Sequence, residues 1–380
     1  MAKRTAVIAI LAAVAVAMLI AGPGRAADRA SRDAERLKRF LQRFPDADAN
    51  KDGVLTMEEV RAFRTKRQGA GARPKQGGGA RPKQGGARPR PTHADVRYRP
   101  HPSNVLDVYL ARSEQPAPLI VFIHGGGFRG GDKRGVDRYI VEQGNAAGIS
   151  VASINYRMLP EFRFPTAMLD SARAIQFLRS KAKEWNLDPR RIACMGGSAG
   201  AGTSLWLAFH DDLADPKSED PVARQSTRLT CAAVAGAQTS YDWRFCERIG
   251  LGGIKKHPVA LPLYGFKEWP ETWPPEADRI AKEVSAINHV TKDDPPVLLT
   301  YRTPAGPEGI RRDPVHHPKF GLVLKERMDK LGVECIVLYP NHPDPKYRTG
   351  QIRALDFIRR HFGMAGAKGA GASRVKRERD

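Results

Sequence analysis

The sequence is poor in cysteine and lacks the cysteine spacing of metal-binding or disulfide-rich domains. Its 380 residues contain four cysteines and no C-x-x-C pair, which argues against a zinc ribbon, a redox-active dithiol or a small disulfide scaffold. Cys194 and Cys231 lie in apolar runs, where cysteine is usually a small buried hydrophobic residue. A Cys231–Cys246 bridge stays open on the sequence alone.

Acidic residues are absent from one long basic segment. Residues 61–90 contain ten Lys or Arg and no Asp or Glu, and residues 365–380 contain five bases against two acids. More than half of the formal net charge of +22 therefore comes from these two segments. We expect a solvated spacer there, with adhesion to an acidic polymer (a uronate or sulfated polysaccharide, nucleic acid or an anionic membrane) as the alternative. Specific nucleic-acid binding is not expected, because no DNA-recognition helix or zinc-finger pattern accompanies the basic residues.

The sequence also lacks an apolar run of the roughly 20 residues that a membrane-spanning helix needs. The apolar stretch Ala6–Ala21 has sixteen residues, follows Lys3 and Arg4, and precedes small residues that suit cleavage before Ala27. This layout is typical of a secretory signal peptide. We expect export to the periplasm, the cell surface or the medium, with an uncleaved anchor as the alternative.

Composition divides the chain into segments. The octapeptide G-A-R-P-K-Q-G-G occurs at 71–78 and again at 79–86. A short period rich in Gly, Pro and Lys cannot bury enough apolar surface to fold, so it predicts a linker. We expect a signal peptide, an EF-hand module, a basic linker, a globular domain and a basic tail at residues 1–26, 27–66, 67–93, 94–363 and 364–380.

Apolar runs in the globular segment alternate with longer amphipathic stretches. The runs predicted to be buried strands are Leu119–Ile123, Ser150–Ile154, Ile192–Met195, Cys231–Ala237, Val297–Thr300 and Cys335–Tyr339. The stretches between them are long enough to be helices, which predicts an α/β fold: a mostly parallel central sheet with helices on both faces. In such sheets the functional site lies at the carboxyl ends of the strands.

The strongest motif is a serine between glycines, directly after a predicted strand and before a predicted helix. Gly196-Gly197-Ser198-Ala199-Gly200 fits the pattern G-x-S-x-G. Glycines permit the tight strand-to-helix turn that exposes a nucleophilic serine. The helix that follows would direct its first amides toward developing negative charge. Ser198 is therefore the candidate nucleophile.

A glycine-rich turn follows the predicted strand Leu119–Ile123. It reads His124-Gly125-Gly126-Gly127-Phe128, and consecutive glycines let backbone amides approach a carbonyl oxygen closely. The amides of Gly126, Gly127 and Ala199 are the predicted oxyanion hole.

Together with shorter matches, these motifs resemble those of one enzyme family. The shorter matches are Tyr156-Arg157, Pro160-Glu161, Phe164-Pro165, Leu187-Asp188-Pro189-Arg190-Arg191-Ile192 and Pro295-Pro296-Val297-Leu298-Leu299. In their order and spacing, residues 95–363 resemble the hormone-sensitive-lipase and feruloyl/acetyl-esterase-like branch of the α/β-hydrolases. The resemblance implies hydrolysis of carboxylic esters through an acyl-serine intermediate, with no cofactor for the chemistry.

A catalytic histidine is expected late in the chain, after the acid. His316, His317 and His342 lie in that window. The resemblance favours His342, because the family places its histidine after the last strand. Asn341-His342-Pro343 departs, however, from the glycine–histidine–glycine that the family usually has there.

The acid is the least defined member of the predicted triad. The family has an aspartate shortly after the strand Val297–Thr300, but Tyr301–Gly306 contains no acid. We interpret residues 303–312 as a short insertion that leaves Asp313 as the acid. Asp242 is the second candidate, and Glu308 and Asp344 remain open.

A calcium loop is predicted near the N-terminus. Its candidate ligands are Asp48, Asn50, Asp52, Val54 (through its carbonyl), Thr56 and Glu59, with Gly53 at the sharp turn. Hard oxygen ligands at this spacing are typical of an EF-hand, and the apolar stripe before Phe44 predicts a flanking helix. We expect calcium to bind there without taking part in the chemistry.

The sequence thus favours an exported serine esterase that acts on a small-molecule or polysaccharide acyl ester. Two alternatives stay open. One is a serine peptidase or amidase on the same fold. The other is a non-catalytic, calcium-dependent binding protein on a degenerate hydrolase scaffold, suggested by the missing acid after Thr300.

Overall fold

A computed structural model describes residues 41, 42, 44–49, 51, 53, 59, 63 and 88–364. The chain divides into two units between Gly85 and Gly86, and each is described by itself. The predicted signal peptide, most of the basic linker and the basic tail lie outside the described residues, as do Asn50, Asp52, Val54 and Thr56 of the predicted calcium loop.

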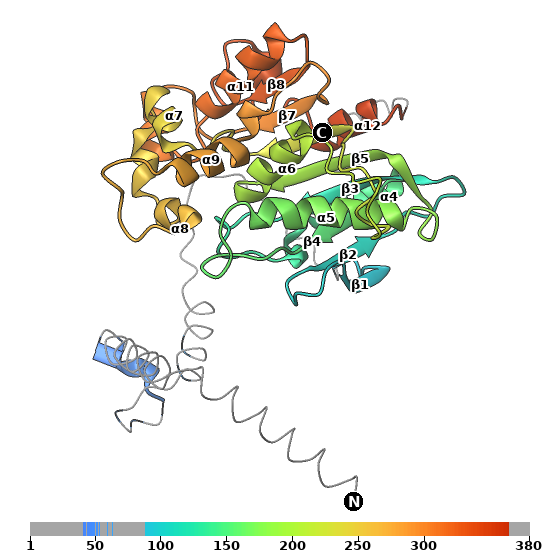
Figure 1. Ribbon diagram of the computed structural model, residues 1–380, viewed down its shortest axis with the longest axis horizontal. Coiled ribbons are helices and arrows are strands. Elements are labelled where there is room, and N and C mark those ends of the chain that lie inside the picture. Colours follow the sequence, from blue (N-terminus) through green and yellow to red (C-terminus); the bar gives the residue numbers. More distant parts are fainter. Residues whose placement is uncertain are drawn as a thin grey trace, which may run out of the picture. The chain divides into compact units, whose positions relative to one another are not determined.

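The larger unit is built on one eight-stranded sheet (Figure 1). Its strands are β1 His93–Arg97, β2 Val105–Tyr109, β3 Ala117–Ile123, β4 Ser150–Ile154, β5 Leu187–Gly197, β6 Cys231–Ala235, β7 Val297–Thr300 and β8 Cys335–Leu338. Their order across the sheet is β1-β2-β4-β3-β5-β6-β7-β8. β2 is antiparallel to both of its neighbours, and the strands from β4 to β8 are parallel. The predicted mostly parallel sheet is confirmed.

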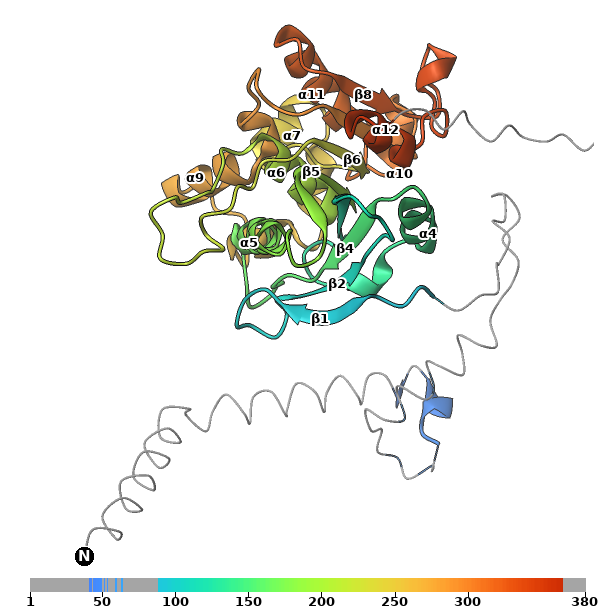
Figure 2. The same cartoon turned by 90° about the vertical axis from the view of Figure 1, so that its right-hand side faces the viewer.

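Helices cover both faces of the sheet. They are α4 Arg138–Ala146, α5 Thr166–Ser180, α6 Ala199–Phe209, α7 Trp243–Arg248, α8 Ala260–Tyr264, α9 Pro275–Val284, α10 Pro307–Arg312, α11 Lys319–Lys330 and α12 Ala354–His361. Short 3-10 turns are η2 Lys133–Gly135, η3 Gly252–Lys256, η4 Ala286–Asn288 and η5 Pro345–Tyr347. α4 and α12 lie on one side of the sheet and α5 and α6 on the other (Figure 2).

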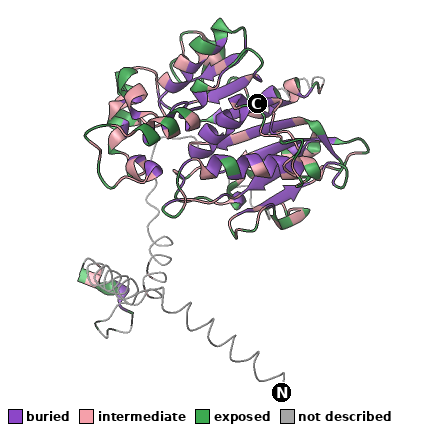
Figure 3. Ribbon diagram, in the orientation of Figure 1, coloured by how far each residue is buried: buried purple, intermediate pink, exposed green. Residues whose placement is uncertain are grey.

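The two faces form two hydrophobic cores because side chains alternate along each strand. Leu119, Val121 and Ile123 of β3 belong to the core under α5 and α6, and Ile120 belongs to the core under α4 and α12. All four side chains are fully buried, and most residues of the central strands are buried (Figure 3). Burial on both faces explains why these strands are continuous apolar runs in the sequence.

The strands β1 and β2 and the helices α7 Trp243–Arg248 and α8 Ala260–Tyr264 were not predicted. β1 and β2 form an antiparallel edge, and each carries an aspartate, Asp95 and Asp107, that interrupts the apolar pattern. A long segment with α7, η3, α8 and α9 is inserted between β6 and β7. The four cysteines are buried free thiols, so no Cys231–Cys246 bridge forms.

Among the described residues, the longest helices fall short of what a bilayer crossing requires in length and apolar character. The predicted export signal lies outside those residues.

The described residues of the smaller unit include the short turn η1 Pro45–Ala47. Ala47 is buried against Leu41, Phe44 and Phe63. The Gly53 amide donates to Asp48 Oδ2 at 2.8 Å, and the Ala49 amide donates to Glu59 Oε1 at 3.2 Å. An EF-hand fold is not established by these few residues, and it stays a prediction.

Candidate active site

Ser198 lies in the sharp turn between β5 and α6. It is the N-cap of α6 with φ +53° and ψ −118°, a strained conformation for a residue with a side chain. The turn requires glycine on both sides. A Cβ on Gly196 would lie 2.7 Å from the Ile123 carbonyl oxygen, and a Cβ on Gly200 would collide with the same atom. The spacing of glycines therefore fixes how the serine is presented.

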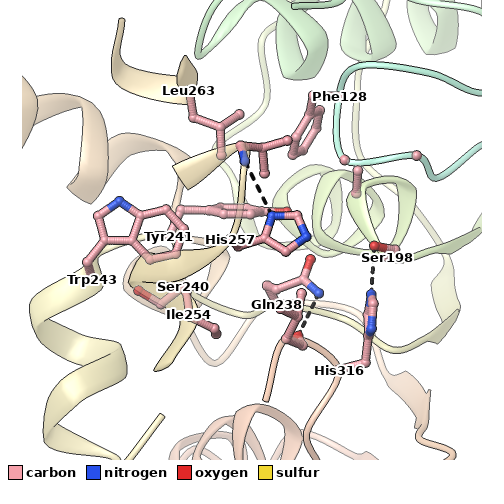
Figure 4. A pocket seen from close by; sticks show the side chains of 15 residues that line it. Phe128, Ser198, Gln238, Ser240, Tyr241, Trp243, Ile254, His257, Leu263 and His316 are labelled. Atoms are coloured by element: carbon pink, nitrogen blue, oxygen red, sulfur yellow. Dashed lines mark hydrogen bonds between the residues drawn. The ribbon is translucent and has the colours of Figure 1, made fainter. Parts of the chain in front are cut away.

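Ser198 is hydrogen-bonded to a histidine that is itself paired with an acid. His316 Nε2 lies 2.8 Å from Ser198 Oγ, and His316 Nδ1 lies 2.8 Å from Asp313 Oδ2 (Figure 4 shows the serine and the histidine). Because the carboxylate can only accept, Nδ1 carries the proton and Nε2 is left to accept the serine hydroxyl. The His316 amide also donates to Asp313 Oδ1 at 3.2 Å. The three side chains have the connectivity of a serine–histidine–aspartate triad.

The backbone around His316 is held by neighbouring side chains. Gln238 Nε2 donates to the Val315 carbonyl at 2.8 Å and to the Gly236 carbonyl at 3.1 Å. Thr303 Oγ1 donates to the His316 carbonyl at 3.3 Å. Gly236, at φ +60°, packs so closely on the imidazole that a Cβ there would lie 3.0 Å from the ring. These contacts fix the ring between Ser198 and Asp313.

The structure corrects the expectation that His342 is the partner of Ser198. His342 follows β8 as predicted, but its Nδ1 accepts the Asp344 amide at 3.0 Å, and its ring packs on Tyr339 and Tyr347. The segment after β7 supplies both histidine and acid, because α10 leads the chain back to the carboxyl end of the sheet. The sequence signals were the spacing Asp313-x-x-His316 and the missing glycines around His342.

The structure places Asp313 at the histidine and the other candidate acids elsewhere. Asp242 caps α7 and pairs with the Arg244 guanidinium at 2.9 Å. Burial alone would raise the pKa of Asp242, but hydrogen bonds from Arg244 lower it overall. Asp344 caps η5 and Glu308 lies in the first turn of α10.

The predicted oxyanion residues line the same cavity as Ser198. Gly126, Gly127 and Ala199 all border it. Gly126 has φ +111° and Gly127 has φ +61°, conformations that glycine adopts readily. The Tyr156 hydroxyl donates to the His124 carbonyl at 2.8 Å, which anchors the start of this glycine turn.

A cavity of about 260 Å³ opens beside Ser198 and His316 (Figure 4). Its apolar lining comes largely from the segment inserted between β6 and β7, together with the glycine turn. These apolar residues are Phe128, Tyr241, Trp243, Ile254, Val259 and Leu263.

One further histidine borders the cavity and was not singled out in the sequence. Burial lowers the pKa of His257, and the charge of His316 lowers it further. His257 is therefore expected to be uncharged at neutral pH. Its Nδ1 accepts the Val259 amide at 3.4 Å, which leaves the proton on Nε2 as a donor.

Solved structures of hydrolases share this fold. An acetyl ester-xyloside bifunctional hydrolase from Caldicellulosiruptor lactoaceticus is 25% identical with a TM-score of 0.54, over 69% of this chain and 89% of that one. A truncated carbohydrate esterase from gut microbiota is 20% identical with a TM-score of 0.54, over 72% of this chain and 95% of that one. The predicted α/β-hydrolase fold is confirmed.

Curated relatives are similar over shorter stretches. Esterase LipC of Mycobacterium tuberculosis is 27% identical over 222 residues, which is 54% of this chain and 49% of the relative. Ethyl acetate hydrolase of Pseudomonas putida is 30% identical over 190 residues, which is 45% of this chain and 59% of the relative. The chain thus spans about half the length of the curated relatives it matches.

The model of the BD-FAE family matches residues 106–303, more than half of the 380-residue chain. The match covers β2 to β7 and includes both the glycine turn and Ser198. The chain therefore belongs to the BD-FAE family.

Proposed function

We propose that this protein is a serine-dependent hydrolase of carboxylic esters that acts on short acyl groups, including acyl groups carried by sugars. The observation that carries the proposal is the unbroken contact from Ser198 Oγ to His316 Nε2 and from His316 Nδ1 to Asp313 Oδ2, each at 2.8 Å. Asp313 would then be the acid that is missing directly after Thr300, and its contact with His316 argues against a non-catalytic scaffold.

In the proposed mechanism His316 acts as base and then as acid. Nε2 takes the Ser198 proton as Oγ attacks the ester carbonyl, and later gives that proton to the leaving alcohol. Asp313 keeps the other ring proton on Nδ1 and stabilises the imidazolium. Water then attacks the acyl-serine while His316 Nε2 takes its proton, and the proton passes to Ser198 Oγ as the carboxylic acid is released.

The glycine turn and the helix start would stabilise the oxyanion. Gly126, Gly127 and Ala199 border the cavity at Ser198, and Ala199 is the first residue of α6. An amide at a helix N-terminus favours negative charge. Donors placed in this way each lower the barrier by roughly 3–4 kcal/mol in serine hydrolases.

The cavity favours a small acyl group. Its volume of about 260 Å³ is below the roughly 300–1,000 Å³ that is typical of sites for drug-sized ligands. Its lining is largely aromatic and aliphatic, which suits the apolar acyl part of an ester. The acetyl ester-xyloside hydrolase and the ethyl acetate hydrolase are named for esters of this size, and this supports short acyl esters as substrates.

A covalent serine probe tests the function directly. The protein is treated with a fluorophosphonate, digested and analysed by mass spectrometry, and p-nitrophenyl acetate hydrolysis is followed in parallel. The expected result is modification of Ser198 alone and loss of turnover at the same rate. Turnover that persists after complete modification of Ser198 contradicts the proposal. Faster cleavage of a matched amide than of the ester would favour the peptidase or amidase alternative.

We also propose that calcium binds the N-terminal loop. Asp48 Oδ1 is buried and has no hydrogen-bond partner among the described residues, and Glu59 Oε1 accepts the Ala49 amide of the same loop. These two carboxylates would be the first and last ligands of an EF-hand, with Asn50, Asp52, Val54 and Thr56 supplying the other oxygens.

Calcium titration of the full chain tests this second proposal. We expect Glu59→Gln to weaken binding by more than about tenfold, because the last ligand is usually bidentate. Glu114→Gln, an exposed glutamate of the larger unit, is the matched control and should bind as the unmodified chain does. Equal calcium binding by both variants would contradict the assignment.

Export is proposed from the sequence of residues 1–26. A protein made with its N-terminus intact should appear outside the cytoplasm with Ala27 as its first residue. Recovery of the uncleaved chain in the membrane fraction would favour the anchor instead.

A further inference from the structure

A cluster of two histidines and a glutamate lies at the far end of α6 from Ser198. His210 is the C-cap of α6, Glu283 lies in the last turn of α9, and His289 is the C-cap of η4. One nitrogen or oxygen of each side chain lies within 4.8 Å of the other two. With eleven residues in α6, the cluster is about 16 Å along the helix from Ser198. It is therefore separate from the triad.

Both histidines are oriented by backbone carbonyls. His210 Nδ1 lies 2.9 Å from the Asp211 carbonyl, and His289 Nε2 lies 2.6 Å from the Glu283 carbonyl. A carbonyl oxygen only accepts, so each of these ring nitrogens carries a proton. The other nitrogen of each neutral ring, Nε2 of His210 and Nδ1 of His289, is left with a free lone pair. This is how metal-binding histidines are usually held.

The lone pair of His210 faces another acceptor. His210 Nε2 lies 3.0 Å from Glu283 Oε1, and an imidazole lone pair and a carboxylate oxygen repel one another unless a cation lies between them. A proton on Nε2 would remove the repulsion between His210 and Glu283 only. A metal ion would be bound by His210 and Glu283 and also by the Nδ1 lone pair of His289.

The surroundings favour a positive charge. α6 and α9, of eleven and ten residues, both end at the cluster, and helix C-termini carry partial negative charge. The fully buried Trp206 closes one side, with its ring 4.2 Å from the His210 ring. Its Nε1 donates to the Glu283 carbonyl at 2.8 Å and holds the end of α9 in place.

We propose that His210, Glu283 and His289 form a zinc site that ties α6 to α9 and η4. Two imidazoles and one carboxylate suit zinc and exclude calcium and magnesium, which require oxygen ligands. Zinc bonds of roughly 2.0–2.1 Å in a tetrahedron place neighbouring ligand atoms about 3.3 Å apart. His210 Nε2 and Glu283 Oε1 are 3.0 Å apart, close to this spacing, and the ligand atom of His289 lies within 4.8 Å of both. Water takes the fourth position, and the site braces the helix that begins at the nucleophile.

The test is a zinc titration of the full chain, prepared without a polyhistidine tag and stripped with chelator, in excess calcium to saturate the N-terminal loop. We expect one zinc ion per chain, a raised melting temperature and unchanged p-nitrophenyl acetate hydrolysis. His210→Gln and His289→Gln should each weaken zinc binding by about tenfold or more. The matched control is His361→Gln, because His361 pairs with Glu334 at 3.1 Å in the same way but without a second histidine.

A second measurement does not depend on any variant folding. Cobalt bound by the unmodified chain should give the visible absorption of a tetrahedral nitrogen and oxygen site, and zinc should displace it. Absence of zinc binding in the micromolar range overturns the proposal. It is equally overturned if Asp313→Asn, rather than the His210 and His289 variants, abolishes binding, because the metal would then lie at the triad.

Discussion

Replacing Asp313 with asparagine should cut catalysis severely without unfolding the protein. The change keeps the side-chain volume and removes the charge that faces His316 Nδ1 at 2.8 Å. An amide nitrogen at that position would donate to Nδ1, and the ring proton would move to Nε2, where it opposes the Ser198 hydroxyl. The wrong tautomer costs about 10⁴ in kcat in a fully buried triad.

The exposure of the pair sets the magnitude. The side chains of His316 and Asp313 are 35% and 38% exposed, so water can replace part of the lost interaction. We therefore expect kcat for p-nitrophenyl acetate to fall by about 10²–10⁴, equal to roughly 2.7–5.4 kcal/mol in the barrier.

Steady-state hydrolysis of p-nitrophenyl acetate measures the effect, with urea unfolding to show that the variant is folded. The matched control is Asp242→Asn, because Asp242 pairs with Arg244 and not with a histidine. Its kcat should change by less than about threefold. If Asp313→Asn keeps full activity, the carboxylate does not orient His316 and this part of the mechanism is refuted.

Three further predictions concern the stability of the larger unit. Burial lowers the pKa of His124, so the neutral ring stabilises the fold above pH 6.5 and this stabilisation is lost as the pH falls. The loss is at most about 1.4 kcal/mol per pH unit. Urea unfolding should therefore show that acid destabilises His124→Gln less than the unmodified chain. Gly200→Ala should destabilise by about 1–3 kcal/mol and abolish turnover, since its Cβ would collide with the Ile123 carbonyl; an active, stable variant would contradict the tight turn. Asp170 is fully buried and accepts hydrogen bonds from Nε and a terminal nitrogen of Arg157. Asp170→Ala should therefore lower the free energy of unfolding by about 3–5 kcal/mol. A decrease below about 1 kcal/mol would refute a structural role for the pair.

The sequence predicted the centre of the fold better than its edges. The parallel strands β3 to β8 are buried on both faces and therefore appear as short continuous apolar runs. β1 and β2 were missed because the aspartates Asp95 and Asp107 interrupt them, and both serve as partners of the buried Lys133. Such a contact depends on residues distant in the chain, so no local pattern indicates it.

The candidate site was predictable where local stereochemistry defines it. The turn at Ser198 needs glycine at 196 and 200 whatever the rest of the chain does, so its sequence pattern is strong. The histidine has no such local requirement. His316 reaches Ser198 only because α10 and the contacts of Gln238 turn the segment after β7 back to the sheet. Order along the chain favoured His342, and tertiary structure placed His316 there instead.

In the proposed mechanism His316, and not His342, is the base that activates Ser198. The most direct measurement compares kcat/KM for p-nitrophenyl acetate in His316→Gln and His342→Gln, with the unfolding free energy of each. We expect kcat/KM to fall by at least about 10³ in His316→Gln, as for other triad members, and by less than about threefold in a folded His342→Gln variant. A folded His316→Gln variant that turns over normally, or a large selective loss in His342→Gln, would contradict it.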